Sequence, residues 1–123
     1  MSTWTLEEQK AHRKLWAAAL RSGKYQQGQF QLQDTRGRMC CLGVLADISG
    51  CEWSPATEIF GMAADGEDRS APLRARNFVG LATSLGSAIS FSLMDLNDGG
   101  ESFATIANII ESEPLGLFIE ATP

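Results

Sequence analysis

The chain has 123 residues, of which 44% are apolar and 20% are charged, a balance typical of one globular domain over residues 1–123. No apolar run approaches the roughly 18 residues that cross a bilayer, and no charged and then apolar leader begins the chain, so we expect a cytoplasmic protein. Three cysteines, two of them adjacent, are poor material for a disulfide framework and favour a reducing compartment.

The net charge of −5 is unevenly distributed along the chain. Residues 1–38 hold seven Lys or Arg and three acidic residues, whereas residues 77–123 hold six acidic residues and no Lys or Arg. An acidic C-terminal third argues against nucleic-acid binding and favours a basic protein partner. Solvated faces are the simpler interpretation of such charge runs.

The first predicted element is a helix over residues 6–22. Thr5-Leu6-Glu7-Glu8 has the form of a capping box, in which the Thr and Glu side chains each bond the other residue's backbone N–H. The apolar stripe of the helix centres on Trp16 and Leu20. Gly23 is the natural stop, because glycine adopts the backbone conformation that ends helices.

A short antiparallel hairpin is predicted next. Gln29-Phe30-Gln31-Leu32-Gln33 alternates polar and apolar residues, which predicts a half-buried strand with Phe30 and Leu32 facing inward. Turn residues follow, so residues 38–40 can return as the partner strand.

A buried helix is predicted over residues 41–48, inside the apolar block Met39-Cys40-Cys41-Leu42-Gly43-Val44-Leu45-Ala46-Asp47. The helical period places Cys41, Val44 and Leu45 on one face, so Cys41 is expected to be buried and unreactive. Gly43 costs roughly 1 kcal/mol relative to alanine in mid-helix, so another backbone or an aromatic ring is expected to lie against it.

The second half of the chain alternates irregular and helical stretches. Residues 51–72 are rich in Pro and Gly and are predicted to be irregular, and a short helix is expected over residues 73–79. Residues 89–96 fit a strand or a helical turn equally well. Ser102 predicts the cap of another helix, and residues 115–119 have strand composition and could add an edge strand to the hairpin.

No motif for catalysis or metal binding emerges. Adjacent Cys40 and Cys41 point apart on a strand and on a helix alike, which disfavours a zinc pair. His12, the only histidine, is interpreted as a boundary residue packed on Trp16 rather than a base for a cysteine. Residues 95–101 imitate the start of a calcium loop but lack its later ligands. We therefore predict no catalytic residue, no metal and no cofactor.

Three segments carry a resemblance when they are taken in order. They are Leu20-Arg21-Ser22-Gly23-Lys24-Tyr25, then Cys40-Cys41-Leu42-Gly43-Val44-Leu45, then Leu96-Asn97-Asp98-Gly99-Gly100-Glu101-Ser102-Phe103-Ala104-Thr105-Ile106-Ala107. In this order they resemble a family of small uncharacterised proteins of bacteriophages and prophages. The resemblance implies a phage-associated protein in the cytoplasm of the host cell, and it carries over no catalytic residue.

The predicted fold class is α+β, with two or three helices packed on a small antiparallel sheet. That sheet would consist of residues 30–33 and 38–40, with residues 115–119 as a further strand. The predicted core residues are Trp16, Leu20, Phe30, Leu32, Cys41, Val44, Leu45, Ile48, Phe103, Ile106 and Ile110.

Two functions of different classes fit these features, and an enzyme has the least support. The first is a binding protein without catalysis that docks on a host protein, such as a defence protein, through an acidic surface. Its residues are Asp95, Asp98, Glu101 and Glu111.

The second is a small-ligand binder or sponge for a nucleotide-type signal. Its aromatic residues for stacking are Tyr25 and Trp53, and its candidate phosphate ligands are Arg36, Arg38, Arg74 and Arg76. An enclosed cavity lined by an aromatic ring and two arginines would favour this function, and a flat acidic face would favour the first. Neither function involves nucleic acid or a membrane, and the sequence does not predict the oligomeric state.

Overall fold

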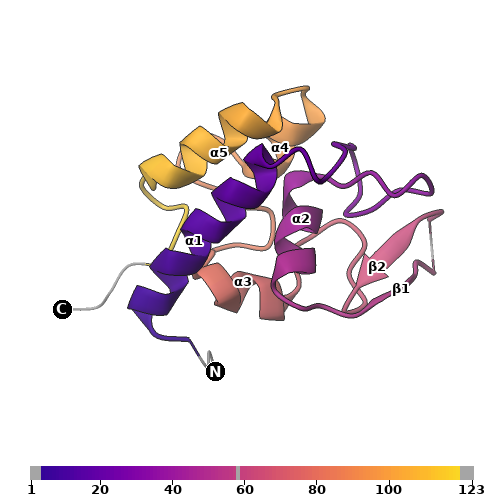
Figure 1. The fold of residues 1–123 in the computed structure, drawn as a ribbon, viewed down its shortest axis with the longest axis horizontal. Coiled ribbons are helices and arrows are strands. Elements are labelled where there is room, and N and C mark those ends of the chain that lie inside the picture. Colours follow the sequence, from indigo (N-terminus) through magenta and orange to yellow (C-terminus); the bar gives the residue numbers. More distant parts are fainter. Residues whose placement is uncertain (1–3, 58, 120–123) are drawn as a thin grey trace.

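The computed structural model describes residues 4–57 and 59–119. These residues form five helices and a two-stranded antiparallel sheet (Figure 1), which confirms the predicted α+β class. The elements in chain order are α1 Leu6–Arg21, α2 Cys41–Ile48, β1 Trp53–Pro55, β2 Met62–Ala64, α3 Leu73–Val79, α4 Leu93–Asp98 and α5 Phe103–Ser112.

Helix α1 begins at the predicted capping box. The backbone N–H of Glu8 donates to Thr5 Oγ1 at 3.1 Å, and the N–H of Thr5 donates to Glu8 Oε1 at 2.9 Å. The helix packs against α5, α3 and α2, and α5 runs alongside it in Figure 1. Trp16 is fully buried, and its indole Nε1 donates to the carbonyl of Cys41 at 3.0 Å. This bond ties α1 to the start of α2.

Side chains of α1 also cap the C-terminal end of α3. The last carbonyls of a helix lack partners within it. Gln9, His12 and Arg13 form hydrogen bonds with the carbonyls of residues 77–79, at 2.9, 2.6 and 2.7 Å respectively. Gly80 follows with φ of +75°, and a Cβ there would lie 2.9 Å from the Gln9 side chain. Side chains of α1 therefore provide hydrogen-bond partners for the last carbonyls of α3, at the point where α3 ends.

The single histidine belongs to this contact rather than to the Trp16 side of α1. Its ring stacks on Phe78, with centroids 3.7 Å apart and planes 3° apart, and Trp4 meets it edge-on at 4.6 Å. The predicted packing of His12 on Trp16 is therefore wrong. The pattern within the predicted helix could not show that α3 packs on the side of α1 that carries His12.

Helix α2 confirms both its predicted bounds and the predicted close approach at Gly43. A Cβ added to Gly43 would lie 2.0 Å from the carbonyl oxygen of Leu32, so only glycine fits beneath that backbone. Cys41, Val44 and Leu45 are fully buried, as predicted.

The sheet lies elsewhere than predicted. It consists of β1 and β2, within the segment that was expected to be irregular, with Trp53 opposite Ala64 and Pro55 opposite Met62. The expected hairpin is reduced to one bridge between Gln33 and Met39. Phe30 interrupts that strand, because it has φ of +70° and is 63% exposed. The alternating pattern was therefore a wrong indicator of a strand.

Two further segments differ from expectation or settle an open choice. Residues 115–119 form a turn and not an edge strand, with the Leu117 N–H bonded to the Pro114 carbonyl and one bridge from Phe118 to Leu81. The ambiguous stretch 89–96 resolves into the start of α4, which Ser92 caps by accepting from the Asp95 N–H at 3.1 Å.

One hydrophobic cluster unites the elements of the described residues. The predicted core residues lie in it except for Phe30, which is exposed, and Ile48, which is only half-buried at its edge. Within residues 4–57 and 59–119, no helix combines the length and the apolar character that crossing a bilayer requires.

Candidate functional site

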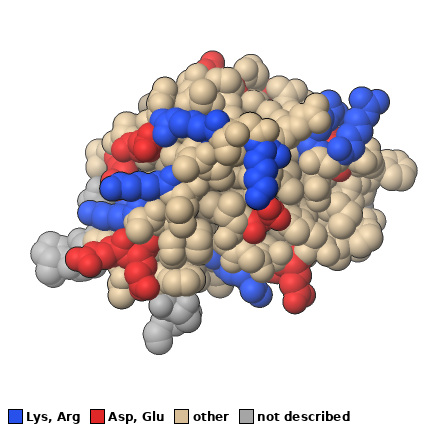
Figure 2. All heavy atoms as spheres, in the orientation of Figure 1, with Lys and Arg blue, Asp and Glu red and all other residues tan. Residues whose placement is uncertain are grey.

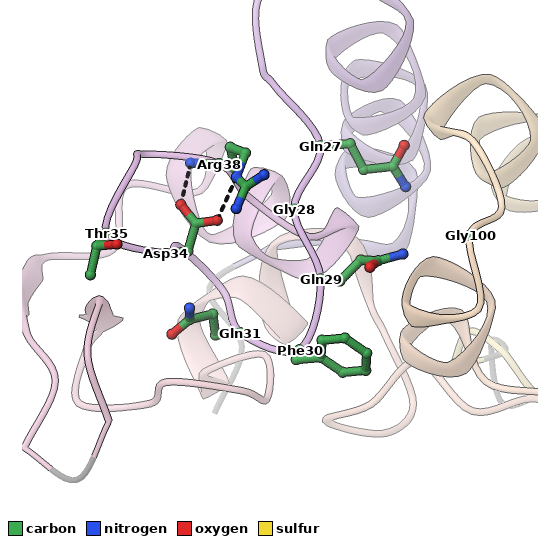
Figure 3. Close-up of a pocket in the computed structure, with 9 residues that line it drawn as sticks. All are labelled: Gln27, Gly28, Gln29, Phe30, Gln31, Asp34, Thr35, Arg38 and Gly100. Carbon is green, nitrogen blue, oxygen red and sulfur yellow. Dashed lines mark hydrogen bonds and ion pairs between the residues drawn. The ribbon is translucent and has the colours of Figure 1, made fainter.

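An open cavity of about 470 Å³ lies where the loop between α1 and α2 meets the turn after α4. Figure 3 shows its wall, which consists of residues 27–31, Asp34, Thr35, Arg38 and Gly100. The Asp34–Arg38 pair lies on one side of the 28–31 backbone, and the Phe30 ring and Gln29 lie on the other. We call this region, together with Asp98 and Glu101 beside it, the loop face.

Asn97 holds the loop face in shape. Its side chain is completely buried, and its Oδ1 accepts from the Cys41 N–H at 3.1 Å and from Gln27 Nε2 at 3.0 Å. Its Nδ2 donates to the Gly28 carbonyl at 2.8 Å. Gln27 Nε2 donates further to the Glu101 carbonyl at 2.8 Å. One amide thus joins the loop, the start of α2 and the end of α4.

Phe30 is the unusual residue of this face. A left-handed backbone is a true outlier for a bulky side chain and costs roughly 1–2 kcal/mol. The conformation persists because the Phe30 N–H donates to Asp98 Oδ1 at 2.8 Å. The fold therefore retains a strained residue while leaving its aromatic ring largely in solvent. Such outliers concentrate at functional sites.

Asp34 and Arg38 form the charged part of the cavity. Asp34 Oδ2 accepts from Arg38 Nε at 2.7 Å, and its Oδ1 accepts from the backbone N–H groups of Arg36 and Arg38 at 2.9 and 3.0 Å. Burial raises the pKa of this carboxyl, but the hydrogen bonds and the guanidinium outweigh that effect and lower its pKa overall. The pair is therefore ionised and fixed in place at neutral pH.

The four acidic residues proposed for partner binding do not lie together. Asp95 and Glu101 are exposed, whereas Asp98 is half-buried and engaged by Phe30. Glu111 lies at the other end of α5, about 15 Å from Glu101 at the rise of a helix. There it pairs with Arg21 of α1 at 2.5 Å.

The unequal charge distribution along the sequence is largely cancelled where α1 meets α5. Glu113 contacts Arg13, just as Glu111 contacts Arg21. Figure 2 shows Lys and Arg side chains standing beside Asp and Glu on this side of the molecule. An anionic surface can therefore exist only where acidic side chains are left without a basic partner.

Tyr25 and Trp53, the two candidate stacking residues, converge on Asp47 and not on the cavity. The Tyr25 hydroxyl donates to Asp47 Oδ2 at 2.7 Å, and Trp53 Nε1 donates to Asp47 Oδ1 at 3.2 Å. Burial, together with this bond, raises the pKa of Tyr25 to about 12. Tyr25 thus holds the loop between α1 and α2 against α2, and Trp53 holds β1 against the same helix.

The four candidate arginines are dispersed as well. Arg74 pairs with Asp65 at 3.0 Å, Arg76 donates to the Ala82 carbonyl at 2.8 Å, and Arg36 is exposed in the turn that follows Asp34. Arg38 alone among them lines the cavity. The arrangement of one aromatic ring with two arginines is therefore not formed there.

All three cysteines are buried, and none of them forms a disulfide. Cys40 and Cys41 are buried, and burial raises the pKa of Cys40 to about 11 and that of Cys41 well above its ordinary value. Burial also raises the pKa of Cys51, which contacts Ser49. Among the residues that the structure describes, no group of three or more His, Cys, Asp or Glu side chains could hold a metal ion.

The buried thiols predict a loss of stability at alkaline pH. Cys40 and Cys41 stay protonated in the folded chain, while unfolded thiols ionise near their ordinary pKa of about 9, so unfolding releases protons above that pH. Stability should be fully present below about pH 9 and fall by about 2 kcal/mol per buried thiol by about pH 10.5. Urea unfolding at both pH values measures this, and Cys40→Ala should reduce the slope. A flat profile would contradict the burial.

Sequence patterns missed several of the residues that build the loop face. Asn97 was not selected, Asp34 was counted among turn residues, and Phe30 was predicted to be core, whereas Asp98 was selected only as an acid of the partner-binding surface. The one local signal was the polar pair Asn97-Asp98 placed before two glycines, since Asn and Asp bond nearby backbone groups readily. Their actual partners lie about 70 residues away, beyond what local patterns encode.

Comparison with known proteins gives one match. A family model described as a domain of unknown function (DUF8296) matches residues 8–114, which include the entire loop face. No curated protein and no solved structure gives a significant match.

Proposed function

The chain belongs to the DUF8296 family, and we propose that it is a small binding protein without catalytic activity that docks on a basic protein through the loop face. The exposed, left-handed Phe30 carries this proposal. The phage and prophage resemblance supports a host protein as the partner, such as a defence protein that is inhibited when it is bound.

Phe30 has the properties of an interface anchor. Interfaces gain most of their energy from a few residues, commonly aromatic ones, near the centre of the contact. Phe30 is held by a hydrogen bond to Asp98, so its backbone loses little freedom on binding. An exposed ring on a fixed backbone therefore binds at a lower entropic cost than a ring on a mobile loop.

The charge around Phe30 selects the partner. In the described part of the chain, no ion pair is formed by Asp98, by Glu101 or by Asp95, which lies one helical turn before Asp98 on α4. Asp34, the nearest other acid of the loop, is neutralised by Arg38. Unpaired rim carboxylates steer a basic surface toward the contact and mainly raise the association rate. Glu111 is left out of this proposal because Arg21 already neutralises it.

Replacing Phe30 with glycine should remove binding without harming the fold. Glycine adopts a φ of +70° without strain, so the free energy of unfolding should stay unchanged or rise by up to about 1 kcal/mol. Urea denaturation measures this change. The control is Leu32→Ala in the same loop, which should cost about 2–5 kcal/mol because Leu32 is fully buried. A loss of stability in Phe30→Gly comparable to that control would show that the ring serves the core.

Reversing the exposed rim charges should weaken association. The double variant Asp95→Lys with Glu101→Lys is preferred over a change at Asp98, since Asp98 also supports the Phe30 backbone. Binding should become roughly tenfold weaker and its salt dependence shallower. Glu7→Lys, in the first turn of α1, is the control and should bind as the parent does.

Quantitative capture from host lysate connects these variants to the function. A true partner is retained by the parent and by Glu7→Lys, lost with Phe30→Gly, reduced with the double reversal and released by salt. A captured protein that ignores all of these changes would place the contact elsewhere and overturn the proposal.

A further inference from the structure

We propose that Arg38 anchors an oxyanion subsite in the cavity, for an organic carboxylate or phosphate that carries a flat apolar group. This inference deepens the small-ligand alternative, from whose residues only Arg38 reaches the cavity, and it does not require docking on a protein.

The guanidinium of Arg38 is oriented but not saturated. Its Nε donates to Asp34, while Nη1 and Nη2 have no hydrogen-bond partner among the described residues. In Figure 3 the guanidinium lies between the Asp34 carboxylate and the Gly28–Gln29 wall. Two parallel N–H groups form the fork that binds a carboxylate or phosphate in two places. Asp34 therefore acts as a positioning residue that leaves this fork available.

The same pair limits what can bind. Asp34 and Arg38 together carry no net charge, so a bare inorganic ion gains little from entering the cavity. Binding has to draw on apolar contact as well, and the exposed Phe30 ring lines the same cavity from the other side of the 28–31 backbone, so the ligand has to be long enough to cross that backbone. A ligand that joins an anionic head to a ring can contact both Arg38 and Phe30, whereas an anion or a ring alone can contact only one of them.

The required chemistry has two sources, a free metabolite and a protein terminus or side chain. Adenosine 5′-monophosphate represents the first, and N-acetyl-phenylalanine, with its free carboxylate, represents the second. N-acetyl-phenylalanine amide keeps the ring without the charge, and inorganic phosphate keeps the charge without a ring. The cavity should bind one or both of the ring-bearing anions and neither of the two incomplete probes.

Titrations followed by ¹H–¹⁵N NMR provide the test, with the Arg38 Nε–H and the Phe30 amide as reporters. Arg38→Gln should weaken binding about tenfold or more, and Arg38→Lys should do the same, because lysine keeps the charge but loses the fork. Arg36→Gln is the matched control from the same turn and should stay within about twofold, since that side chain is exposed.

Three outcomes would overturn the subsite: the amide binds as well as the acid, no ring-bearing anion shifts the reporters, or Arg36→Gln weakens binding as much as Arg38→Gln. Lysate capture separates this inference from the proposed function. Arg38→Gln should weaken anion binding about tenfold or more, whereas the double reversal at Asp95 and Glu101, which do not line the cavity, should reduce protein capture and leave anion binding within about twofold. An unchanged anion affinity in Arg38→Gln would mean that the subsite has failed, and unchanged capture in the double reversal would mean that the proposed function has failed.

Discussion

Gly43→Ala is expected to destabilise the protein by about 3 kcal/mol or more, although alanine is the better helix former. The new Cβ would lie 2.0 Å from the Leu32 carbonyl oxygen, so either α2 or the loop backbone must move by about an ångström. Both are packed in the core, which leaves no flexible side chain to yield. Chemical denaturation of the variant measures the change in the free energy of unfolding.

Gly23→Ala is the matched control for this experiment. Gly23 has φ of +77° but open space around its Cα, so alanine there tests backbone strain without a clash and should cost about 1 kcal/mol. Gly43→Leu should be at least as severe as Gly43→Ala. If Gly43→Ala is no worse than Gly23→Ala, the contact between α2 and Leu32 is looser than the structure shows.

Asn97→Ala is expected to cost about 3 kcal/mol and to release the loop face. The substitution leaves the Cys41 N–H and the Gly28 carbonyl without partners in a buried environment, and each such orphan costs about 1–3 kcal/mol. Asn97→Asp should be comparably harmful, because a buried carboxylate cannot donate to Gly28. The measurement is urea unfolding combined with the NMR shift of the Phe30 amide.

The control for Asn97 is Asn108→Ala on α5. Asn108 is exposed and accepts one hydrogen bond from Arg21, so its loss should stay within about 0.5 kcal/mol. The Phe30 amide shift should change with Asn97→Ala and not with Asn108→Ala. An unchanged Phe30 environment in Asn97→Ala would mean that the loop holds its shape without this amide.

Helices were predictable because their signals are local. Thr5 and Ser102 act as caps at the expected places, with Ser102 accepting from the Thr105 N–H at 3.2 Å. The argument at Gly43 also held, since a mid-helix glycine needs a packing reason and the Leu32 backbone supplies one. The caps and Gly43 could be identified from sequence because each residue type stands out at its position in a helix. The structure then shows the backbone group that each one bonds or packs against.

The strand prediction failed because distant residues decided the backbone of residues 29–33. The Phe30 N–H goes to Asp98, and the Leu32 N–H goes to the Asp68 carbonyl at 2.8 Å. These partners replace a ladder to residues 38–40, and Phe30 turns outward as a result. An alternating pattern cannot distinguish a strand from a loop whose donors are claimed elsewhere.

The candidate site was predictable only in its parts. Asp98, Glu101 and Arg38 were selected from the sequence, and all three lie at the loop face, where Asp98 bonds Phe30, Glu101 bonds Gln27 and Arg38 lines the cavity. Glu111 was grouped with the acids because sequence distance ignores the packing of α5 on α1, which brings Arg21 to it. Pairing between charges on different helices is a tertiary property, and it decides which charges remain free.

The hydrogen bonds of Asn97 and Asp98 also determine when the loop face exists. They connect residues that are 56 to 69 positions apart. During synthesis, the loop face therefore cannot form until α4 has emerged from the ribosome. An excised peptide of residues 23–40 would lack it for the same reason. Because binding-competent geometry and the folded state are coupled, any ligand of this face would stabilise the whole domain by mass action, and a rise in melting temperature would serve as a screen for one.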